Sequence, residues 1–237
     1  MSMDLFRKIV DESVDVKVSK FVIHGLGEPL LDRHLDERIR YVHETLYGVP
    51  VEIYTNGQFL TPKRFQELKD AGINGIVVSL NAVRAEQHEA IMGLNCFEQI
   101  CANLDTILNR PKDHIGISIH ACQDGKMFTA KDNIEFRKRW GDRARVIVMG
   151  NWAGDKDTVR PFDPNSYCYR SDRTVYITYD GKLTMCCFDP TGLTVFGDLN
   201  EETLKDVYDS VSYRRFRLAH KENRAAEYEQ CRGCSRI

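Results

Sequence analysis

The sequence predicts an α/β protein, built from a parallel sheet with helices and followed by a small cysteine-rich unit. Between residues 21 and 151, short runs rich in β-branched residues alternate with segments whose apolar residues recur at helical spacing, a pattern typical of βα units. With 237 residues, 42% of them hydrophobic, the chain can bury one large core and carry a small appendage. Five of the eight cysteines lie in the last third of the chain, where the alternation has stopped.

The first zone contains five segments with the composition of buried strands and several helical stripes between them. Thr61-Pro62 is a helix start that Gly72 can close. Other stripes are formed by apolar residues at helical spacing, namely Leu35, Ile39, Val42 and Leu46, and then Phe97, Ile100, Cys101, Leu104 and Leu108. The expected strands are 20–24, 51–55, 75–80, 115–120 and 144–149.

An amphipathic segment over residues 3–14 precedes the first of these strands. Leu5, Phe6, Ile9 and Val10 fall on one of its sides, which predicts a helix of the crossover type. A crossover helix follows a strand, yet no strand precedes this segment in the sequence. We therefore expect the chain to start inside a βα unit.

The second zone starts after a polar connection that contains two prolines. Residues 174–179 and 182–185 flank Asp180-Gly181, and Asp-Gly between alternating runs predicts a hairpin. Residues 200–220 have a helical pattern, and Cys231-Arg-Gly-Cys234 follows. The expected organisation is a sheet domain over residues 1–153, a linker over 154–166 and a cysteine-rich domain over 167–237.

Several of the expected strands end in a small or polar residue. In parallel βα architectures, sites form at the carboxyl ends of the strands. The strand ends read His24-Gly25, Thr55-Asn56, Ser79-Leu80-Asn81, His120 and Gly150-Asn151. The pattern therefore predicts that hydrogen-bonding groups line one edge of the sheet.

The late cysteines have the spacing of a metal site that two segments share. Cys168 precedes the predicted hairpin, Cys186 ends it, and Cys231 and Cys234 follow. Four thiolates suit either zinc or an iron-sulfur cluster, and metal binding would supply folding free energy to a domain with little core. Because adjacent side chains on a strand point to opposite faces, only one member of the Cys186-Cys187 pair is expected to face the metal.

The composition gives no reason to expect nucleic-acid or membrane binding. The net charge is −2, and no apolar stretch has signal-peptide or membrane-span character. We expect a cytoplasmic protein, in which cysteines are reduced thiols or metal ligands and not disulfides.

Taken in order, the strand-end motifs and the cysteine pattern resemble a known family. Gly25-Leu-Gly-Glu-Pro-Leu30, Tyr54-Thr-Asn-Gly57 and Val78-Ser-Leu-Asn81 each follow a strand, and the chain ends with Cys168, Gly181, Cys186-Cys187 and Cys231-x-x-Cys234. This order is similar to that of radical S-adenosylmethionine enzymes with a SPASM or twitch-type C-terminal extension. The resemblance implies a partial parallel (β/α)6-type barrel and favours Cys186 over Cys187 as the ligand.

The resemblance also implies roles for individual residues. Glu28 would bind the methionine amino group of S-adenosylmethionine, with Gly25 and Gly27 allowing close backbone approach, and a carboxylate matches an ammonium group. Ser79 and Asn81 would contact its ribose and carboxylate, Asn56 would lie in the same layer, and Met149 to Asn151 would border the adenine. Cys168, Cys186, Cys231 and Cys234 would hold one auxiliary 4Fe-4S cluster.

One part of the family pattern is missing. The family holds its catalytic 4Fe-4S cluster on a Cys-x-x-x-Cys-x-x-Cys loop after the first barrel strand, whereas no cysteine precedes Cys96 here. The expected strands number five, one short of the family's six. We expect that an N-terminal segment with the first strand and this loop belongs to the intact protein; loss of the radical chemistry is the alternative.

The implied reaction is hydrogen abstraction by a 5'-deoxyadenosyl radical, leading to oxidation or modification of a peptide or a small carbohydrate-like substrate. Flavodoxin or ferredoxin would supply electrons, and this chain alone would be inactive. His24, Tyr54 and His120 are weak candidates for catalytic pocket residues. A zinc-stabilised scaffold module and a barrel protein without radical chemistry remain alternatives.

Overall fold

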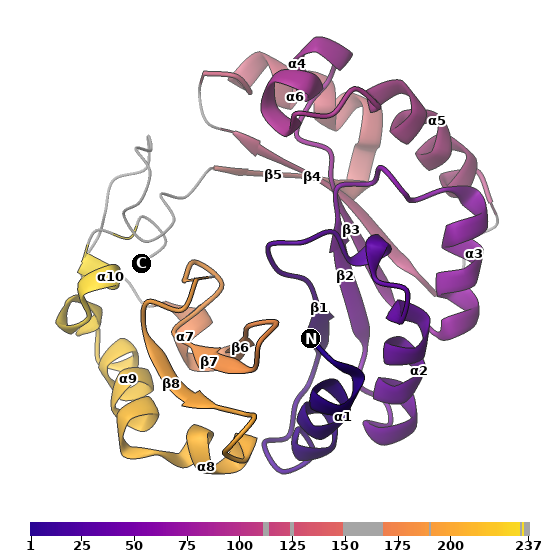
Figure 1. Cartoon of the computed structure of the whole chain (residues 1–237). Coiled ribbons are helices and arrows are strands. Elements are labelled where there is room, and N and C mark those ends of the chain that lie inside the picture. The colour runs from indigo at the N-terminus through magenta and orange to yellow at the C-terminus, as the bar shows by residue number, and fades with distance from the viewer. Residues whose placement is uncertain (111–113, 124–125, 149–167, 190, 233, 235–237) are drawn as a thin grey trace. The chain divides into compact units, whose positions relative to one another are not determined.

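The structure, a computed structural model of the whole chain (Figure 1), divides into two compact units. One unit comprises Val18–Val148, and the other comprises Met1–Lys17 together with Met149–Ile237. The described residues are all except 111–113, 124–125, 149–167, 190, 233 and 235–237. The predicted linker over 154–166 lies outside the described residues. None of the helices in the described ranges has the length and apolar character needed to cross a membrane.

The first unit is built on a parallel sheet of five strands in sequential order. All five predicted strands are present, and the α/β fold class is confirmed. The predicted strand at 115–120 continues to Gln123. The strands are β1 (Phe21–Ile23), β2 (Val51–Thr55), β3 (Gly75–Ser79), β4 (Gly116–Gln123) and β5 (Ala144–Val148).

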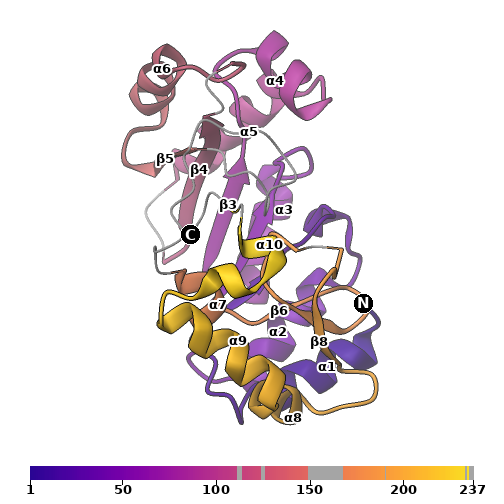
Figure 2. The same ribbon diagram turned by 90° about the vertical axis from the view of Figure 1, so that its left-hand side faces the viewer.

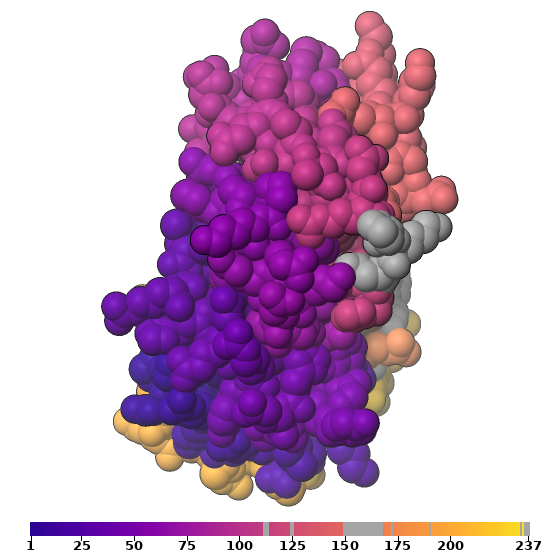
Figure 3. All heavy atoms as spheres, turned by 90° about the vertical axis from the view of Figure 1, so that its right-hand side faces the viewer, coloured from indigo at the N-terminus to yellow at the C-terminus, as the bar shows by residue number. Residues whose placement is uncertain are grey.

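Helices α2 (Leu35–Thr45), α3 (Pro62–Ala71) and α5 (Phe97–Leu108) lie along one side of this sheet (Figure 1). Seen from that side, their atoms form a closed layer coloured purple to magenta (Figure 3). The predicted limits of α3 are correct: the Thr61 hydroxyl accepts from Arg64 N at 3.1 Å, and Gly72 ends the helix at φ 100°, which favours glycine. The helices thus cover one face with apolar side chains and leave the strand ends free for a site.

Four further elements of this unit were not predicted from the sequence. They are α4 (Ala85–Met92), α6 (Ala130–Trp140) and the short 3-10 turn η1 (Pro29–Leu31), and a second such turn, η2 (Gly141–Arg143), follows α6. Helix α6 begins with a capping box, in which Thr129 and Asp132 exchange side-chain to backbone hydrogen bonds. Such a box satisfies two backbone N–H groups that the helix itself leaves unpaired.

The second unit contains a small antiparallel sheet in the order β6-β7-β8. The predicted hairpin is formed by β6 (Tyr176–Ile177) and β7 (Lys182–Thr184), and Gly181 in its turn has φ 92°. Strand β8 (Val195–Asp198) was not predicted. The helical elements are α7 (Tyr169–Arg173), α8 (Leu204–Asp209), α9 (Val211–Lys221), η3 (Ala225–Glu227) and α10 (Glu229–Arg232); Figure 2 shows α8, α9 and α10 as a continuous yellow path.

Helix α1 (Met3–Glu12) is grouped with this second unit and not with the sheet domain to which the sequence assigned it. Ile9 is 3% exposed and belongs to the core around Leu183, Val207 and Phe216. A Glu12 carboxylate oxygen accepts from Leu204 N at 2.7 Å, which satisfies an unpaired N–H at the start of α8. The apolar stripe of α1 therefore has a partner that periodicity alone does not identify.

Candidate functional site

The Gly-Glu-Pro turn after β1 holds its glutamate in a fixed position over the end of β2. Glu28 Oε1 accepts from Thr55 Oγ1 at 2.6 Å and from Leu30 N at 3.0 Å. Glu28 Oε2 accepts from Asn56 N at 2.7 Å. A carboxylate oxygen has about two acceptor positions, so Oε2 keeps one for a ligand.

A cavity of about 310 Å³ lies beside this carboxylate. It is formed at the carboxyl ends of three neighbouring strands, as predicted for a βα site. A Cβ added at Gly27 would meet nothing within 4 Å, so the backbone there is open to close approach. The lining residues are His24, Gly25, Leu26, Gly27, Glu28, Tyr54, Thr55, Asn56 and Ser79.

The structure brings five of the seven predicted cofactor residues together around this cavity: Gly25, Gly27, Glu28, Asn56 and Ser79. Asn81 is not among the lining residues. Its Oδ1 accepts from Cys122 N at 2.9 Å, its Nδ2 lies 3.1 Å from Met92 Sδ, and its φ is 57°, so its side chain links β3 to β4. Asn151, together with the adenine segment 149–151, lies outside the described residues.

The three candidate catalytic residues form a row of rings. His24 and Tyr54 line the cavity, with ring centroids 4.9 Å apart. Tyr54 meets His120 edge to face at 6.2 Å, and His120 Nε2 lies 3.0 Å from Ser118 Oγ. Burial and then the Arg145 charge lower the pKa of His120, which favours a neutral imidazole.

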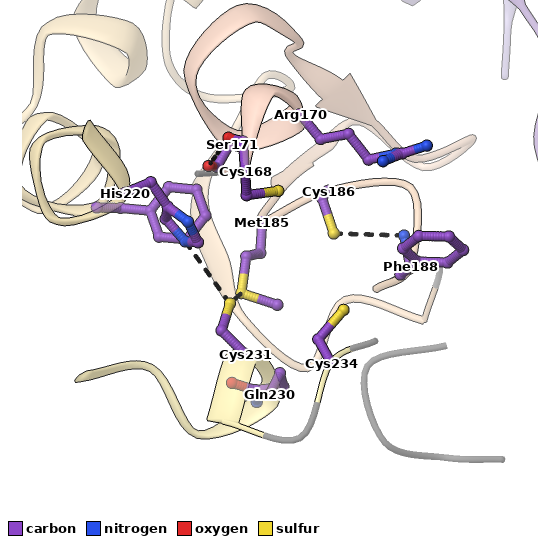
Figure 4. Close-up of a pocket in the computed structure, with 11 residues that line it drawn as sticks. Cys168, Arg170, Ser171, Met185, Cys186, Phe188, His220, Gln230, Cys231 and Cys234 are labelled. Atoms are coloured by element: carbon purple, nitrogen blue, oxygen red, sulfur yellow. Dashed lines mark hydrogen bonds between the residues drawn. The ribbon is translucent and has the colours of Figure 1, made fainter. Parts of the chain in front are cut away.

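The second site is a cavity of about 20 Å³ in the cysteine-rich unit, lined by Cys168, Cys186, Cys231 and Cys234 (Figure 4). Cys168 immediately precedes α7, Cys186 follows β7, and Cys231 lies in α10. Cys168, Cys231 and Cys234 are 8%, 6% and 6% exposed and are part of the apolar core. Cys187 is not among the lining residues. Three segments distant in sequence thus direct four thiols toward one space.

The loop after β7 orients Cys186. Phe188 N donates to Cys186 Sγ at 3.4 Å, and the Asp189 carboxylate accepts from Leu193 N and Thr194 N at 2.7 and 2.9 Å. Burial raises the pKa of the Cys186 thiol to about 12. A metal must therefore displace the thiol proton, which links metal binding to proton release.

Seven lining residues of this cavity were not predicted from the sequence, and two of them lie beside Cys231. His220 Nε2 and Met185 Sδ each lie 3.6 Å from Cys231 Sγ. Burial lowers the pKa of His220 to about 4, so its imidazole is neutral. The sequence placed His220 at the end of the predicted helical segment 200–220, with no signal that it faces the cysteines.

The arrangement of the thiols bears on the kind of metal. Within the described ranges, no three side chains of the His, Cys, Asp and Glu types are grouped closely enough to hold one metal ion. A tetrahedral zinc site with Zn–S bonds of about 2.3 Å needs sulfur atoms about 3.8 Å apart. A 4Fe-4S cluster instead places each thiolate on a different iron, so its ligands are spread more widely. Four thiols that line one cavity form a donor set that suits zinc as well as an iron-sulfur cluster.

Two family models match the chain. The Radical SAM superfamily model matches residues 1–120. The model of the SPASM iron-sulfur cluster-binding domain matches residues 168–235, a range that includes all four cavity cysteines.

Individual relatives agree with these matches. An S-adenosyl-L-methionine-dependent 2-deoxy-scyllo-inosamine dehydrogenase from Niallia circulans is 22% identical over 100% of this chain and 81% of its own length. The structure of BtrN in complex with AdoMet and 2-DOIA has a TM-score of 0.65 at 20% identity and covers 99% of this chain and 80% of that chain. The structure of SuiB of Streptococcus suis, bound to the precursor peptide SuiA, has a TM-score of 0.67 at 16% identity. The match covers 90% of this chain and 59% of that chain.

The relatives named as a dehydrogenase and as cyclases are enzymes, and the solved structures share the fold of this chain. The family match extends over half of the chain and includes the Gly-Glu-Pro turn and the first three strands. This chain belongs to the radical SAM superfamily and carries a SPASM iron-sulfur domain at its C-terminal end.

Proposed function

We propose that this chain is part of a radical S-adenosylmethionine enzyme that oxidises a small carbohydrate-like alcohol, with one auxiliary 4Fe-4S cluster in its SPASM domain. The observation that carries the proposal is the presence, in one chain, of a cavity with a fixed carboxylate and of ligands for one cluster. The choice of an alcohol is supported by the relative from Niallia circulans, a dehydrogenase aligned over the whole of this chain.

Glu28 would bind the α-ammonium group of S-adenosylmethionine. Its carboxylate is held by donors from Thr55, Leu30 and Asn56, so it is oriented before the ligand arrives. The open acceptor position on Oε2 can take one N–H of the ammonium group, a charge-assisted bond. Ser79 and Asn56 line the same cavity and would bind the polar groups of the cofactor. Asn151 would complete the contacts assigned by resemblance, whereas the Asn81 side chain is engaged with Cys122 and Met92 and would need to turn to reach the cofactor.

Cys168, Cys186, Cys231 and Cys234 would each bind one iron of the auxiliary cluster. When bound, such a cluster supplies one-electron redox chemistry. Four thiolates for four irons leave no iron free for substrate, which favours a role in electron transfer. Oxidation of an alcohol to a carbonyl removes one hydrogen atom, one proton and one electron from the substrate. The hydrogen atom would pass to the 5'-deoxyadenosyl radical, and the electron would pass to the cluster.

His24 and Tyr54 on the cavity wall would bind substrate hydroxyls. Their rings are in contact at 4.9 Å, and each can donate or accept a hydrogen bond. The proton released on oxidation would leave through this polar wall. A peptide substrate is the second candidate, supported by the likeness of the fold to SuiB.

We propose further that this polypeptide alone binds the auxiliary cluster but does not cleave S-adenosylmethionine. Cleavage in the family requires a cluster on a three-cysteine loop, and the cysteines outside the SPASM domain, Cys96, Cys101 and Cys122, lack its spacing. In the intact enzyme, flavodoxin or ferredoxin would deliver electrons.

Anaerobic reconstitution with iron and sulfide tests the cluster assignment. We expect about four irons and four sulfides per chain, a brown protein, and no formation of 5'-deoxyadenosine. About one zinc and no iron would instead support the scaffold alternative. Formation of 5'-deoxyadenosine by this polypeptide would contradict the proposed division of roles.

The substrate class is tested by thermal shift on the reconstituted protein. We expect S-adenosylmethionine to raise Tm, and 2-deoxy-scyllo-inosamine to raise it further in the presence of S-adenosylmethionine, because a ligand that binds only the folded state stabilises it. A response to S-adenosylmethionine with none to the aminocyclitol would reject the alcohol proposal and direct attention to peptides.

A further inference from the structure

His220 lies against one of the proposed cluster ligands. It is in the last turn of α9, 2% exposed, and lines the cysteine cavity (Figure 4). Its Nε2 lies 3.6 Å from Cys231 Sγ, within hydrogen-bond distance for sulfur. Phe188 N donates to a second cavity thiol, at Cys186 Sγ.

Aromatic packing fixes the direction of the imidazole. The Phe216 ring, one helical turn earlier, lies edge to face at 4.7 Å, and the Tyr228 ring stacks at 6.2 Å with an interplanar angle of 22°. These contacts hold the ring on the side of the cavity where Cys231 lies. The orientation of His220 therefore does not depend on a bound metal.

The hydrogen bonding of the ring selects its tautomer. Nδ1 is buried and has no hydrogen-bond partner among the residues that the structure describes. A buried N–H without an acceptor is unfavourable, so the proton is better placed on Nε2. A metal-bound Cys231 is a thiolate, which can only accept, and this tautomer is the one that can donate to it.

We propose that His220 is a positioning residue for the auxiliary cluster, whose Nε2–H donates to the Cys231 thiolate and raises the reduction potential of the cluster. This inference rests on the proposed cluster. Hydrogen bonds to ligand sulfur atoms stabilise the more negative, reduced state and so shift the potential upward. The effect would make the cluster a better acceptor for the electron of an oxidised substrate.

A histidine that only fills the core would behave differently. Its removal would change the stability of the domain, but the potential of a loaded cluster would stay the same. Potential and iron content, measured together, separate the two roles.

The test compares three variants of the reconstituted full chain by redox titration with EPR detection of the reduced cluster. His220→Phe keeps an aromatic ring but removes the donor. His220→Gln restores an N–H. Val207→Ala disturbs the core of the same unit at a buried residue outside the cavity lining. For His220→Phe at matched iron content we expect the ratio of reduced to oxidised cluster, at the wild-type midpoint, to fall about 2- to 10-fold, the effect of one hydrogen bond. We expect His220→Gln to recover part of this ratio and Val207→Ala to leave it unchanged.

An unchanged ratio in His220→Phe would overturn the proposal, as would an equal fall in Val207→Ala. A measurement on wild-type protein does not depend on the folding of any variant. With ¹⁵N-labelled histidine, pulsed EPR of the reduced cluster should show a coupled nitrogen and an exchangeable proton, and their absence would also overturn it. If wild-type protein binds no iron, the cluster assignment itself fails, an outcome that iron analysis identifies before any titration.

Discussion

At the residue scale, Glu28 has a structural role that the hydrogen bonds show and the binding role that we propose. Thr55, Leu30 and Asn56 all donate to its carboxylate. These hydrogen bonds hold the carboxylate group in one position at the cavity wall. A carboxylate held in this way loses little conformational freedom when a cation binds. Its substitution should therefore affect affinity more than an average surface acid would.

Glu28→Gln is expected to weaken binding of S-adenosylmethionine about 10- to 100-fold, the loss of one charge-assisted hydrogen bond. Isothermal titration calorimetry on reconstituted protein measures the change. Glu52→Gln is the matched control, because Glu52 lies in β2, whose end holds the Glu28 carboxylate, but pairs with Lys20 and is outside the cavity lining. Equal affinity in Glu28→Gln and wild type would remove Glu28 from the cofactor site.

Cys186 and Cys187 provide a second test at this scale. Cys186 lines the cysteine cavity and accepts a hydrogen bond from Phe188 N, whereas Cys187 is not part of the lining. We expect Cys186→Ser to reduce iron content and the absorbance of the cluster strongly, because serine is a poorer ligand for iron than a thiolate. Cys187→Ser should retain both. The reverse result would assign the fourth ligand to Cys187.

At the element scale, the start of α6 depends on a buried ionised carboxylate. Burial alone would raise the pKa of Asp132, but hydrogen bonds from Thr129 and Arg84 and the Arg84 charge outweigh burial and lower the pKa to about 2. The ordinary value is 3.8. The contribution of Asp132 to the free energy of unfolding is therefore present above about pH 4 and is lost as the pH falls toward 2.

Asp132→Asn is expected to lower the free energy of unfolding by about 1–2 kcal/mol at pH 7, given that the partner Arg84 is half exposed. The difference between variant and wild type should shrink between pH 4 and pH 2, because the wild-type carboxyl is then protonated. Urea unfolding at several pH values measures it. A difference independent of pH would show that the charge of Asp132 contributes nothing.

Helix α1 offers a test of the packing in the cysteine-rich unit. Ile9→Ala is expected to destabilise that unit by about 2–4 kcal/mol, since it leaves a cavity in the core, and to speed the loss of iron to a chelator. Val14→Ala is the control, because Val14 is 55% exposed. Equal rates of iron loss in the two variants would show that α1 does not support the cysteine site.

At the scale of the whole molecule, the two units position their candidate site residues in different ways. The sheet unit uses the parallel register of its strands to place the ends of β1, β2 and β3 around one cavity. The cysteine-rich unit has a small sheet and relies on a core that includes three of the four proposed ligands. Since metal binding contributes folding free energy, the second unit should depend more strongly on its cluster.

Removal of the cluster by an iron chelator under anaerobic conditions is expected to lower the Tm of the cysteine-rich unit by more than that of the sheet unit. Hydrogen exchange with mass spectrometry reports the two units separately. We expect faster exchange in residues 168–232 and little change in residues 51–79. A uniform change in both segments would show that the cluster stabilises the chain as a whole.

The sequence by itself determined the features that local pattern encodes. Strand positions follow from runs of β-branched residues, the limits of α3 follow from Thr61-Pro62 and Gly72, and the radical SAM and SPASM assignments follow from motif order. These signals depend on residues close together in the chain, or on fixed spacings. The predicted roles of Glu28 and of the four cysteines as ligands stay predictions that the cavities support.

Only the tertiary structure decided which distant segments meet. It grouped α1 with the cysteine-rich unit, turned the Asn81 side chain toward Cys122 N, and placed His220 beside Cys231. An apolar stripe in the sequence shows that a helix packs against a core, but it does not identify that core. In the same way, the sequence does not identify the hydrogen-bonding partner of a polar side chain. Such choices depend on packing and hydrogen bonding between residues far apart in sequence, which periodicity and spacing do not record.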